Sequence, residues 1–191
     1  MPLDTLHGLF LDELKDLYNA ENQLLKALPR MAKAATHADL KAAFTDHLAV
    51  TRAQVERLDT IFAGLGASPK GKKCKAMEGL IAEAKEVLAE GGEESVVDAA
   101  LIACAQRVEH YEMAGYGCVR TFAKLLGYTD AERLLQATLD EEGAADRALS
   151  ALAETVVNPD ALVAAGEEAA NLAAAKKAPA KKGKAVAGGA R

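Results

Sequence analysis

A helical stripe of apolar residues runs through residues 101–126, LIACAQRVEHYEMAGYGCVRTFAKLL. Positions three or four apart share one face of a helix, and on this face Glu109 and Glu112 interrupt the apolar series near its middle. The remaining members of the stripe are Ile102, Ala105, Tyr116, Val119, Ala123 and Leu126. The pattern predicts a helix that faces the core and carries two carboxylates into it.

The same interruption recurs in three other stretches with helical spacing. The interrupting residues are Glu21 within residues 10–28, His47 within residues 40–61, and Glu142 with Asp146 within residues 135–149. A charged group that is buried must be paired, protonated or coordinated to a metal, because burial without compensation is costly. We therefore interpret these side chains as candidate metal ligands that converge in one core.

Carboxylate oxygens combined with an imidazole nitrogen suit iron, manganese or zinc. Separations of three or four residues place two ligands on one helix face, as in Glu109-x-x-Glu112 and Glu142-x-x-x-Asp146. Two metal ions bridged by carboxylates would neutralise several acids at once. The sequence thus predicts a dinuclear iron or manganese site, with zinc as a further option.

An alternative is that these residues lie at the edges of apolar faces, reach water and pair with arginines. The candidate partners are Arg52, Arg107, Arg120 and Arg147. For any one helix taken alone this alternative is stronger. The recurrence near the middles of four predicted helices favours a metal ion instead.

Other polar residues lie about one helical turn from the proposed ligands. Tyr18 and Tyr116 flank the site, where a phenol could hydrogen-bond a ligand or take part in one-electron chemistry, although such tyrosines often only fill a core. Glu141 is a substitute ligand if the register is shifted by one residue. We interpret Thr51 and Gln54 as polar groups that support the ligands or pack in the core. His110 is predicted to face outward or to support a ligand.

The composition indicates one all-α domain. The chain has 191 residues and a mass of 20.0 kDa, no tryptophan and only 4% aromatic residues, so strand-forming residues are scarce while Ala and Leu are abundant. The predicted helices span residues 6–35, 36–63, 76–90, 95–127 and 129–156, with capping boxes at Thr36/Asp39, Ser95/Asp98 and Thr129/Glu132. The long second connection predicts a ferritin-like antiparallel four-helix bundle whose crossover contains an extra short helix.

We expect three segments along the chain. Residues 1–157 form the bundle, residues 158–172 a C-terminal helix, and residues 173–191 a disordered basic tail of Lys, Ala and Pro. The tail carries six positive residues and no acid, so a net charge of −5 for the chain leaves −11 on the remainder. An acidic body attracts cations, and the tail is either a non-specific contact to nucleic acid or a solubilising end.

The three cysteines indicate a reducing compartment. Cys74, Cys104 and Cys118 are odd in number and lack Cys-x-x-Cys spacing, and the chain start shows neither a targeting signal nor an apolar run of about 20 residues. We expect a cytoplasmic protein without a membrane span. Cys74 lies among lysines, which favours a reactive thiolate, although it could equally be a packed residue at a helix start. Cys104 and Cys118 are predicted core residues.

Five runs of the sequence resemble those of the bacterial YciE/YciF stress proteins. They are ELKDLYNAENQLLKALPRMA, HLAVTRAQVERLDTIF, CKAMEGL, LIACAQRVEHYEMAGYG and LLQATLDEE, and they occur in the same order over about residues 6–153. The resemblance implies a ferritin-like bundle related to rubrerythrins and other di-iron carboxylate proteins, a homodimer, and a part in stress responses. It places Glu21, His47, Glu109, Glu112 and Glu142 at metal-facing positions, with Asp146 as a weaker candidate.

The chain departs from the standard di-iron pattern in one respect. Such proteins carry Glu-x-x-His on two helices, whereas here Phe44 stands three residues before His47 and Ala145 three residues after Glu142. We therefore expect one metal position to be weak or vacant. The leading hypothesis is a metal-binding stress-response protein that acts on peroxide or oxygen. The alternatives are a non-catalytic structural or partner-binding dimer, and a stress protein tethered to nucleic acid by its tail.

Overall fold

A computed structural model describes residues 4–164 of the chain, and every element in this part is helical. The elements are α1 Leu6–Ala34, α2 Ala38–Gly64, α3 Lys75–Glu90, α4 Glu94–Leu126, α5 Thr129–Leu152, a π-helical turn Ala153–Val157, and α6 Asn158–Ala164. The expected all-α class is confirmed.

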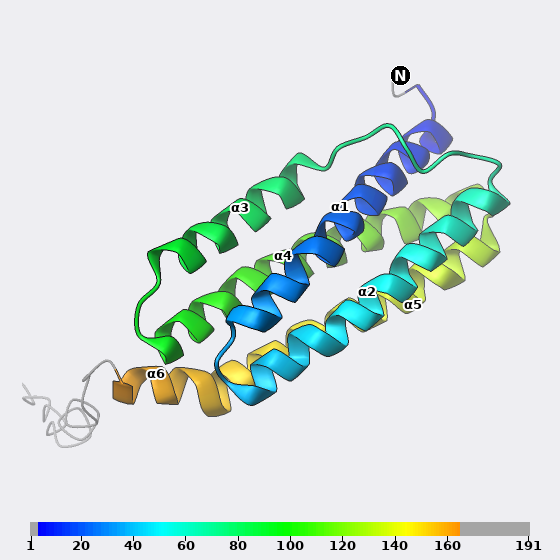
Figure 1. Cartoon of the computed structure of the whole chain (residues 1–191). Coiled ribbons are helices and arrows are strands. Elements are labelled where there is room, and N and C mark those ends of the chain that lie inside the picture. The colour runs from blue at the N-terminus through cyan, green and yellow to red at the C-terminus, as the bar shows by residue number, and fades with distance from the viewer. Residues whose placement is uncertain (1–3, 165–191) are drawn as a thin grey trace, which may run out of the picture.

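Four long helices form an antiparallel bundle made of two hairpins (Figure 1). α1 packs against α2 in the first hairpin and α4 against α5 in the second, while α1 also contacts α4 and α2 contacts α5. The chain returns from the end of α2 to the start of α4 along the length of the bundle, and α3 lies on this return, packed against α4 and α1 (Figure 1). This is the predicted ferritin-like topology with its extra helix in the crossover.

The core is divided into two apolar clusters with a polar layer between them. One cluster contains Leu24, Leu28, Phe44, Leu101, Ile102 and Leu149, among others. The second contains Phe10, Leu14, Leu58, Val119 and Leu135, among others. Along each long helix the apolar residues of one cluster give way to those of the other, and the interrupting polar residues fall at the change. The fold therefore places them in one layer across the middle of the bundle.

The side chain of Leu17 on α1 packs against Gly115 of α4 beside this layer. A Cβ atom added at Gly115 of α4 would lie 2.8 Å from Cδ2 of Leu17 on α1, and Leu17 is itself buried. Any larger residue at position 115 would push against this buried side chain, so glycine leaves the room that Leu17 occupies.

Two helices begin near their predicted residues, but the predicted capping boxes do not form there. The Thr36/Asp39 capping box does not form, because His37 precedes α2 and its Nδ1 accepts a hydrogen bond from the amide of Asp39. The hydroxyl of Thr36 bonds instead to Asp98, 62 residues away. At α5, Thr129 is the first helical residue and no side chain caps the helix.

The Ser95/Asp98 capping box is also wrong. Both residues lie inside α4, and Glu93 precedes the helix without a capping side chain. Asp98 is buried, and its carboxylate accepts hydrogen bonds from the amide and hydroxyl of Thr36 and from the amide of His37. The spacing predicted that Asp98 caps its own helix, but its carboxylate instead joins α4 to the turn between α1 and α2.

Other helix ends match their predicted signals. The hydroxyl of Thr5 accepts a hydrogen bond from the amide of Gly8 at the start of α1, and Gly127 ends α4 with φ +75°. The predicted end of the fourth bundle helix at residue 156 is replaced by the π-helical turn, which leads directly into α6. No break separates the bundle from the C-terminal helix at this point.

The predicted C-terminal helix, residues 158–172, is described only as far as Ala164, and the predicted tail, residues 173–191, lies outside the described residues. Among the helices that the structure does describe, none combines the length and the apolar character that a membrane crossing requires.

Candidate metal centre

The polar layer receives acidic and imidazole side chains from all four long helices. α1 supplies Glu21, α2 supplies His47, α4 supplies Glu109 and Glu112, and α5 supplies Glu142. Glu21, Glu112 and Glu142 have no exposed surface, and Glu109 is 3% exposed. Each helix carries its acidic or imidazole residues on the face that is otherwise apolar, which is why spacing alone could locate these side chains.

Four of these residues form a compact group. One ligand atom from each of His47, Glu109, Glu112 and Glu142 lies within 4.8 Å of the corresponding atom of every other. The Nε2 atom of His47 is 3.5 Å from Oε1 of Glu109 and 3.9 Å from Oε2 of Glu142. Both separations are longer than a usual hydrogen bond, so the imidazole of His47 faces the two carboxyl groups without bonding either of them.

Glu21 lies beside the group of four and is held by a different contact. Its Oε1 accepts a hydrogen bond of 2.5 Å from the hydroxyl of Tyr116, which is also completely buried. The negative charge of Glu142 raises the pKa of Glu21, after burial itself, so the two carboxyl groups are close enough to repel. Glu21 therefore lies at the border of the cluster, with Oε1 hydrogen-bonded to Tyr116 and Oε2 without a hydrogen-bond partner in the described part of the chain.

The cluster carries an excess of buried acceptor atoms without partners in the described part of the chain. These atoms are Oε2 of Glu21, Nε2 of His47, Oε2 of Glu109, both carboxylate oxygens of Glu112, and Oε2 of Glu142. Buried polar atoms are almost always hydrogen-bonded in folded proteins. Six unpaired atoms from five residues of one layer fit a cation, since oxygen and imidazole nitrogen are ligand atoms of iron, manganese and zinc.

Without a cation the carboxyl groups retain protons. Burial is the largest cause that raises the pKa of Glu21, of Glu112 and of Glu109, the last to about 10, and neighbouring carboxylates raise them further. Burial also raises the pKa of Glu142, to about 7, although a hydrogen bond from Glu109 works in the opposite direction. Burial therefore favours the protonated form of Glu109, which donates a hydrogen bond to Glu142.

The imidazole responds to burial in the opposite sense. Burial lowers the pKa of His47, against the smaller effect of the Glu141 carboxylate, because a positive charge is poorly solvated in the core. His47 is thus neutral near pH 7. A neutral imidazole offers a nitrogen lone pair, which is the form that a metal ion requires.

Gln54 and Arg57 on α2 hold the α5 side of the cluster. The amide of Gln54 donates to Oε1 of Glu142 at 2.6 Å and to Glu141 at 3.3 Å. Arg57 donates to both carboxylate oxygens of Glu141, each at 2.6 Å, and to the hydroxyl of Thr138 at 3.1 Å. Gln54 thereby acts as the supporting group that the sequence suggested, and Glu141 is an ion-pair partner at the edge.

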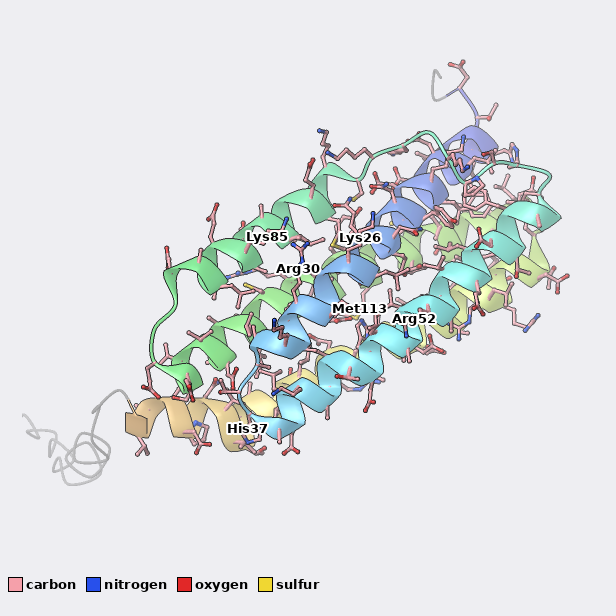
Figure 2. The ribbon with its side chains drawn as sticks, viewed as in Figure 1. Lys26, Arg30, His37, Arg52, Lys85 and Met113 are labelled. Atoms are coloured by element: carbon pink, nitrogen blue, oxygen red, sulfur yellow. The ribbon has the colours of Figure 1, made fainter. Side chains whose placement is uncertain are left out.

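Sequence reasoning missed Arg57. Of the four arginines proposed as alternative partners, Arg107 pairs with Glu83 and Arg52 is exposed on α2 (Figure 2). No ion pair within the described residues joins an arginine to the group of four. Arg57 lies three residues after Gln54, so its place on the same helix face was the signal available for finding it.

Asp146 and Tyr18 are not brought into the group of four. Oδ1 of Asp146 accepts a hydrogen bond of 3.2 Å from the side-chain amide of Gln106. The same oxygen lies 3.2 Å from Nε2 of the exposed His110. The ring of Tyr18 packs edge-on against Phe62 with a centroid distance of 6.0 Å. The outward position predicted for His110 is confirmed, and of the two tyrosines only Tyr116 contacts a proposed ligand.

Two alternatives were open for Cys74, a reactive thiolate and a packed residue at a helix start, and the structure agrees with the second. The residue is completely buried at the start of α3, where its Sγ accepts a hydrogen bond from the amide of Met77 and lies 2.9 Å from the hydroxyl of Tyr111. Burial and the nearby Asp16 raise the pKa of its thiol. The packed alternative is the one observed. Cys104 is buried as predicted, whereas Cys118 is exposed and does not belong to the core.

The bundle and its cluster define a ferritin-like helical protein with a buried group of residues that could bind a metal ion. The chain belongs to the family described as "Domain of unknown function (DUF892)", whose model matches residues 5–162. It is 46% identical over 162 residues to Protein YciF of Escherichia coli strain K12, which covers 84% of this chain and 98% of that protein. The resemblance noted in the sequence is thereby confirmed.

Solved structures agree with this assignment. The crystal structure of the E. coli stress protein YciF matches with a TM-score of 0.79 and 46% identity, over 81% of this chain and 98% of that one. YcfI of Rhodopseudomonas palustris, described as a candidate structural protein, matches with a TM-score of 0.76 and 46% identity, over 78% and 95%. A protein of Xanthomonas campestris shares the fold at 16% identity, with a TM-score of 0.65 over 80% and 94%.

Proposed function

We propose that this protein is a stress-response metal protein that binds iron or manganese, with zinc as a further option, in the polar layer of its bundle. The observation that carries the proposal is the convergence of six unpaired buried ligand atoms from Glu21, His47, Glu109, Glu112 and Glu142. The name of the E. coli stress protein to which the chain is similar supports the stress response.

Each proposed ligand has a distinct part. His47 offers a neutral nitrogen, and Glu109 and Glu112 offer oxygens from adjacent turns of α4. Gln54 orients Glu142 by its 2.6 Å hydrogen bond, while Tyr116 keeps its proton and holds Glu21. Bound iron or manganese would supply one-electron chemistry towards peroxide or oxygen. The single histidine and the position of Glu21 beside the group of four favour one strong and one weaker metal position.

Metal content tests the proposal. We expect elemental analysis to find one to two equivalents of metal per chain after anaerobic incubation with ferrous iron. The Glu112→Gln variant should retain less than about half of this, because the amide cannot provide the anionic oxygen that metal binding uses. Since the pKa of Glu112 is raised in the metal-free protein, the neutral amide resembles its protonated form and should leave the fold intact.

Asp140→Asn is the matched control. It removes one carboxylate from the exposed side of α5, two residues before Glu142, and should leave the metal content unchanged. Equal metal content in wild-type, Glu112→Gln and Asp140→Asn proteins would place the metal elsewhere. No metal above background in a folded wild-type protein would refute the metal-binding function.

The second candidate is a structural bundle without bound metal. Its support is the structural role ascribed to the similar R. palustris protein, together with raised carboxyl pKa values that keep the layer neutral when it is protonated. Thermal unfolding with and without a chelator separates the two functions, because a ligand that binds only the native state raises the apparent stability. A melting temperature that is indifferent to chelator and to added iron favours the structural candidate.

Dimerisation in the cytoplasm is a further part of the proposal and comes from the family resemblance. Light scattering should then give a mass near twice the 20.0 kDa of one chain. A mass equal to one chain over the micromolar range would remove the homodimer from the proposed function.

A further inference from the structure

A cavity of about 370 Å³ opens beside the metal centre between the four long helices. Its apolar lining consists of Leu24, Leu28, Met31, Ala43, Phe44, Val50, Ala105, Val108, Ala144, Ala145, Ala148 and Leu149. The small side chains come mainly from α5, where alanine occupies three lining positions and leaves the space between α2 and α5 unfilled. The volume lies within the range of about 300–1,000 Å³ that is usual for small-molecule sites.

The polar residues of the lining are all acids or imidazole. They are Asp46, His47, Glu109 and Glu141, and no lysine or arginine among residues 4–164 lines the cavity. An anionic ligand would therefore meet acidic side chains and no basic side chain in this lining, and burying its charge would be costly.

Two lining residues, His47 and Glu109, belong to the proposed metal centre as well. Nε2 of His47 and Oε2 of Glu109 are both buried without a hydrogen-bond partner in the described part of the chain. The side chains of these two residues form part of the cavity wall. The cavity is therefore apolar over most of its lining and polar where it borders the cluster.

From this combination we propose that the cavity binds a neutral molecule with a hydrocarbon chain and one small polar end group, a hydroxyl or hydroperoxyl, placed against His47 and Glu109. The apolar lining accommodates the chain. The end group lies at the polar part of the lining, which contains the side chains of Asp46, His47, Glu109 and Glu141. An apolar cavity of about 150 Å³ holds benzene, so the present volume accommodates a chain of roughly eight to twelve carbon atoms.

The binding site itself stands on the cavity, whereas its role as a substrate site rests on the proposed metal-dependent function. With metal bound, the end group of the ligand would lie next to two of the proposed metal ligands. Alcohols and alkyl hydroperoxides with hydrocarbon chains are then the substrate class that the site favours.

Metal-free protein and 1-octanol provide the direct test. Met31 lines the cavity, whereas Met77 and Met113 do not, so the methyl signals of carbon-13-labelled methionine distinguish binding in the cavity from general effects. Figure 2 labels Met113 on α4. We expect 1-octanol to shift the Met31 signal saturably and to leave the signals of Met77 and Met113 unchanged. Octanoate should bind at least tenfold more weakly near neutral pH.

Variants that fill the cavity sharpen the test. Ala148→Phe places a ring in the cavity from an exposed position of α5, and Ala144→Phe is a second variant of the same kind. Each should weaken octanol binding at least tenfold. Ala114→Phe on the exposed side of α4 lies outside the lining and should bind as wild type does. Circular dichroism establishes that each variant is folded.

Absence of a Met31 shift, or equal binding in Ala148→Phe, Ala144→Phe and Ala114→Phe, would overturn the cavity site. Octanoate that binds as tightly as octanol would overturn the preference for a neutral ligand. Because these measurements use metal-free protein, their failure is separate from a failure of metal binding, which the iron content of Glu112→Gln measures.

Discussion

The hydroxyl of Tyr116 on α4 donates a 2.5 Å hydrogen bond to Oε1 of Glu21 on α1, and neither side chain has exposed surface. The bond joins the two hairpins of the bundle across the polar layer. Burial and the neighbouring acids raise the pKa of Tyr116, so the phenol keeps its proton and remains a donor.

Tyr116→Phe removes this donor and leaves a second buried oxygen of Glu21 without a partner. We expect the free energy of unfolding to fall by about 1–3 kcal/mol in metal-free protein, as measured by urea denaturation. Tyr128→Phe is the control, since its hydroxyl bonds His7 at 2.9 Å in a half-buried position and should cost less. Equal losses of unfolding free energy in the two variants would mean that the buried bond between Tyr116 and Glu21 stabilises the protein no more than the half-buried bond of Tyr128.

Stability of the metal-free protein should fall as pH rises. The folded-state pKa of Glu142 is about 7 and that of Glu109 about 10, both above the ordinary value of 4.5. Between the ordinary and the raised value the native state binds a proton that the unfolded chain has lost, so stability declines with pH. We expect the urea midpoint to decrease from about pH 6.5 to about pH 9.

His47 acts in the opposite direction but in a lower range. Its pKa is lowered below the ordinary 6.5, so the unfolded chain takes up a proton first and stability is lost as pH falls through that region. Above about pH 6.5 the carboxyl groups therefore determine how stability changes with pH. Glu109→Gln should make the decline shallower, and a midpoint that rises with pH in wild-type protein would contradict the raised pKa values of Glu109 and Glu142.

Metal should reverse this dependence on pH. Binding uses ionised carboxylates, so protons compete with the metal ion at low pH. We expect the increase in melting temperature caused by added ferrous or manganous ion to be larger at about pH 8 than at about pH 5.5. The comparison is made at fixed ionic strength, and an increase that is independent of pH would indicate a site that lacks these carboxylates.

Asp98→Ala should destabilise the protein far more than Asp39→Ala. Asp98 is buried and accepts bonds from two backbone amides and a hydroxyl at the α1–α2 turn, so its loss leaves several donors unpaired. We expect a cost of at least about 2 kcal/mol in urea denaturation. Asp39 is exposed in the first turn of α2, and its removal should cost less than about 1 kcal/mol.

One thiol per chain should react quickly with a disulfide reagent in native protein. Cys118 is exposed, whereas Cys74 and Cys104 are buried and have raised thiol pKa values. All three should react after unfolding. A Cys118→Ser variant should lose the fast reaction, and a fast reaction that remains in this variant would restore the reactive role first considered for Cys74.

Residues 173–191 should account for any binding to nucleic acid. Six positive residues without aromatic neighbours predict electrostatic binding, with a slope of the logarithm of the binding constant against the logarithm of salt concentration of up to about −5. Fluorescence anisotropy with a DNA duplex compares the full chain with a chain that ends at residue 172. Equal binding by both would exclude the tail as the contact.

Periodicity was sufficient for the fold and for most of the cluster. Each long helix has one inward stripe, and a carboxylate or imidazole in the middle of such a stripe has no alternative direction in which to point. For this reason Glu21, His47, Glu109, Glu112 and Glu142 all proved to lie in one layer. The single-helix spacing that added Asp146 could not distinguish the layer from its rim.

Contacts between distant segments were not accessible from spacing. Asp98 resembles a local cap in sequence, but its partners are 61 and 62 residues away. Cys74 has lysines as sequence neighbours, yet in space it faces Tyr111 from α4. In both cases the side chain contacts residues that are distant in sequence, and these contacts replace the interactions that its sequence neighbours suggested.

Gly115 has a consequence that extends beyond packing. Leu17 lies one helical turn before Glu21 on α1, and Gly115 lies three residues after Glu112 on α4, so the contact between Leu17 and Gly115 occurs where both helices send a carboxylate into the polar layer. A larger residue at position 115 would therefore displace acidic side chains that it does not itself touch.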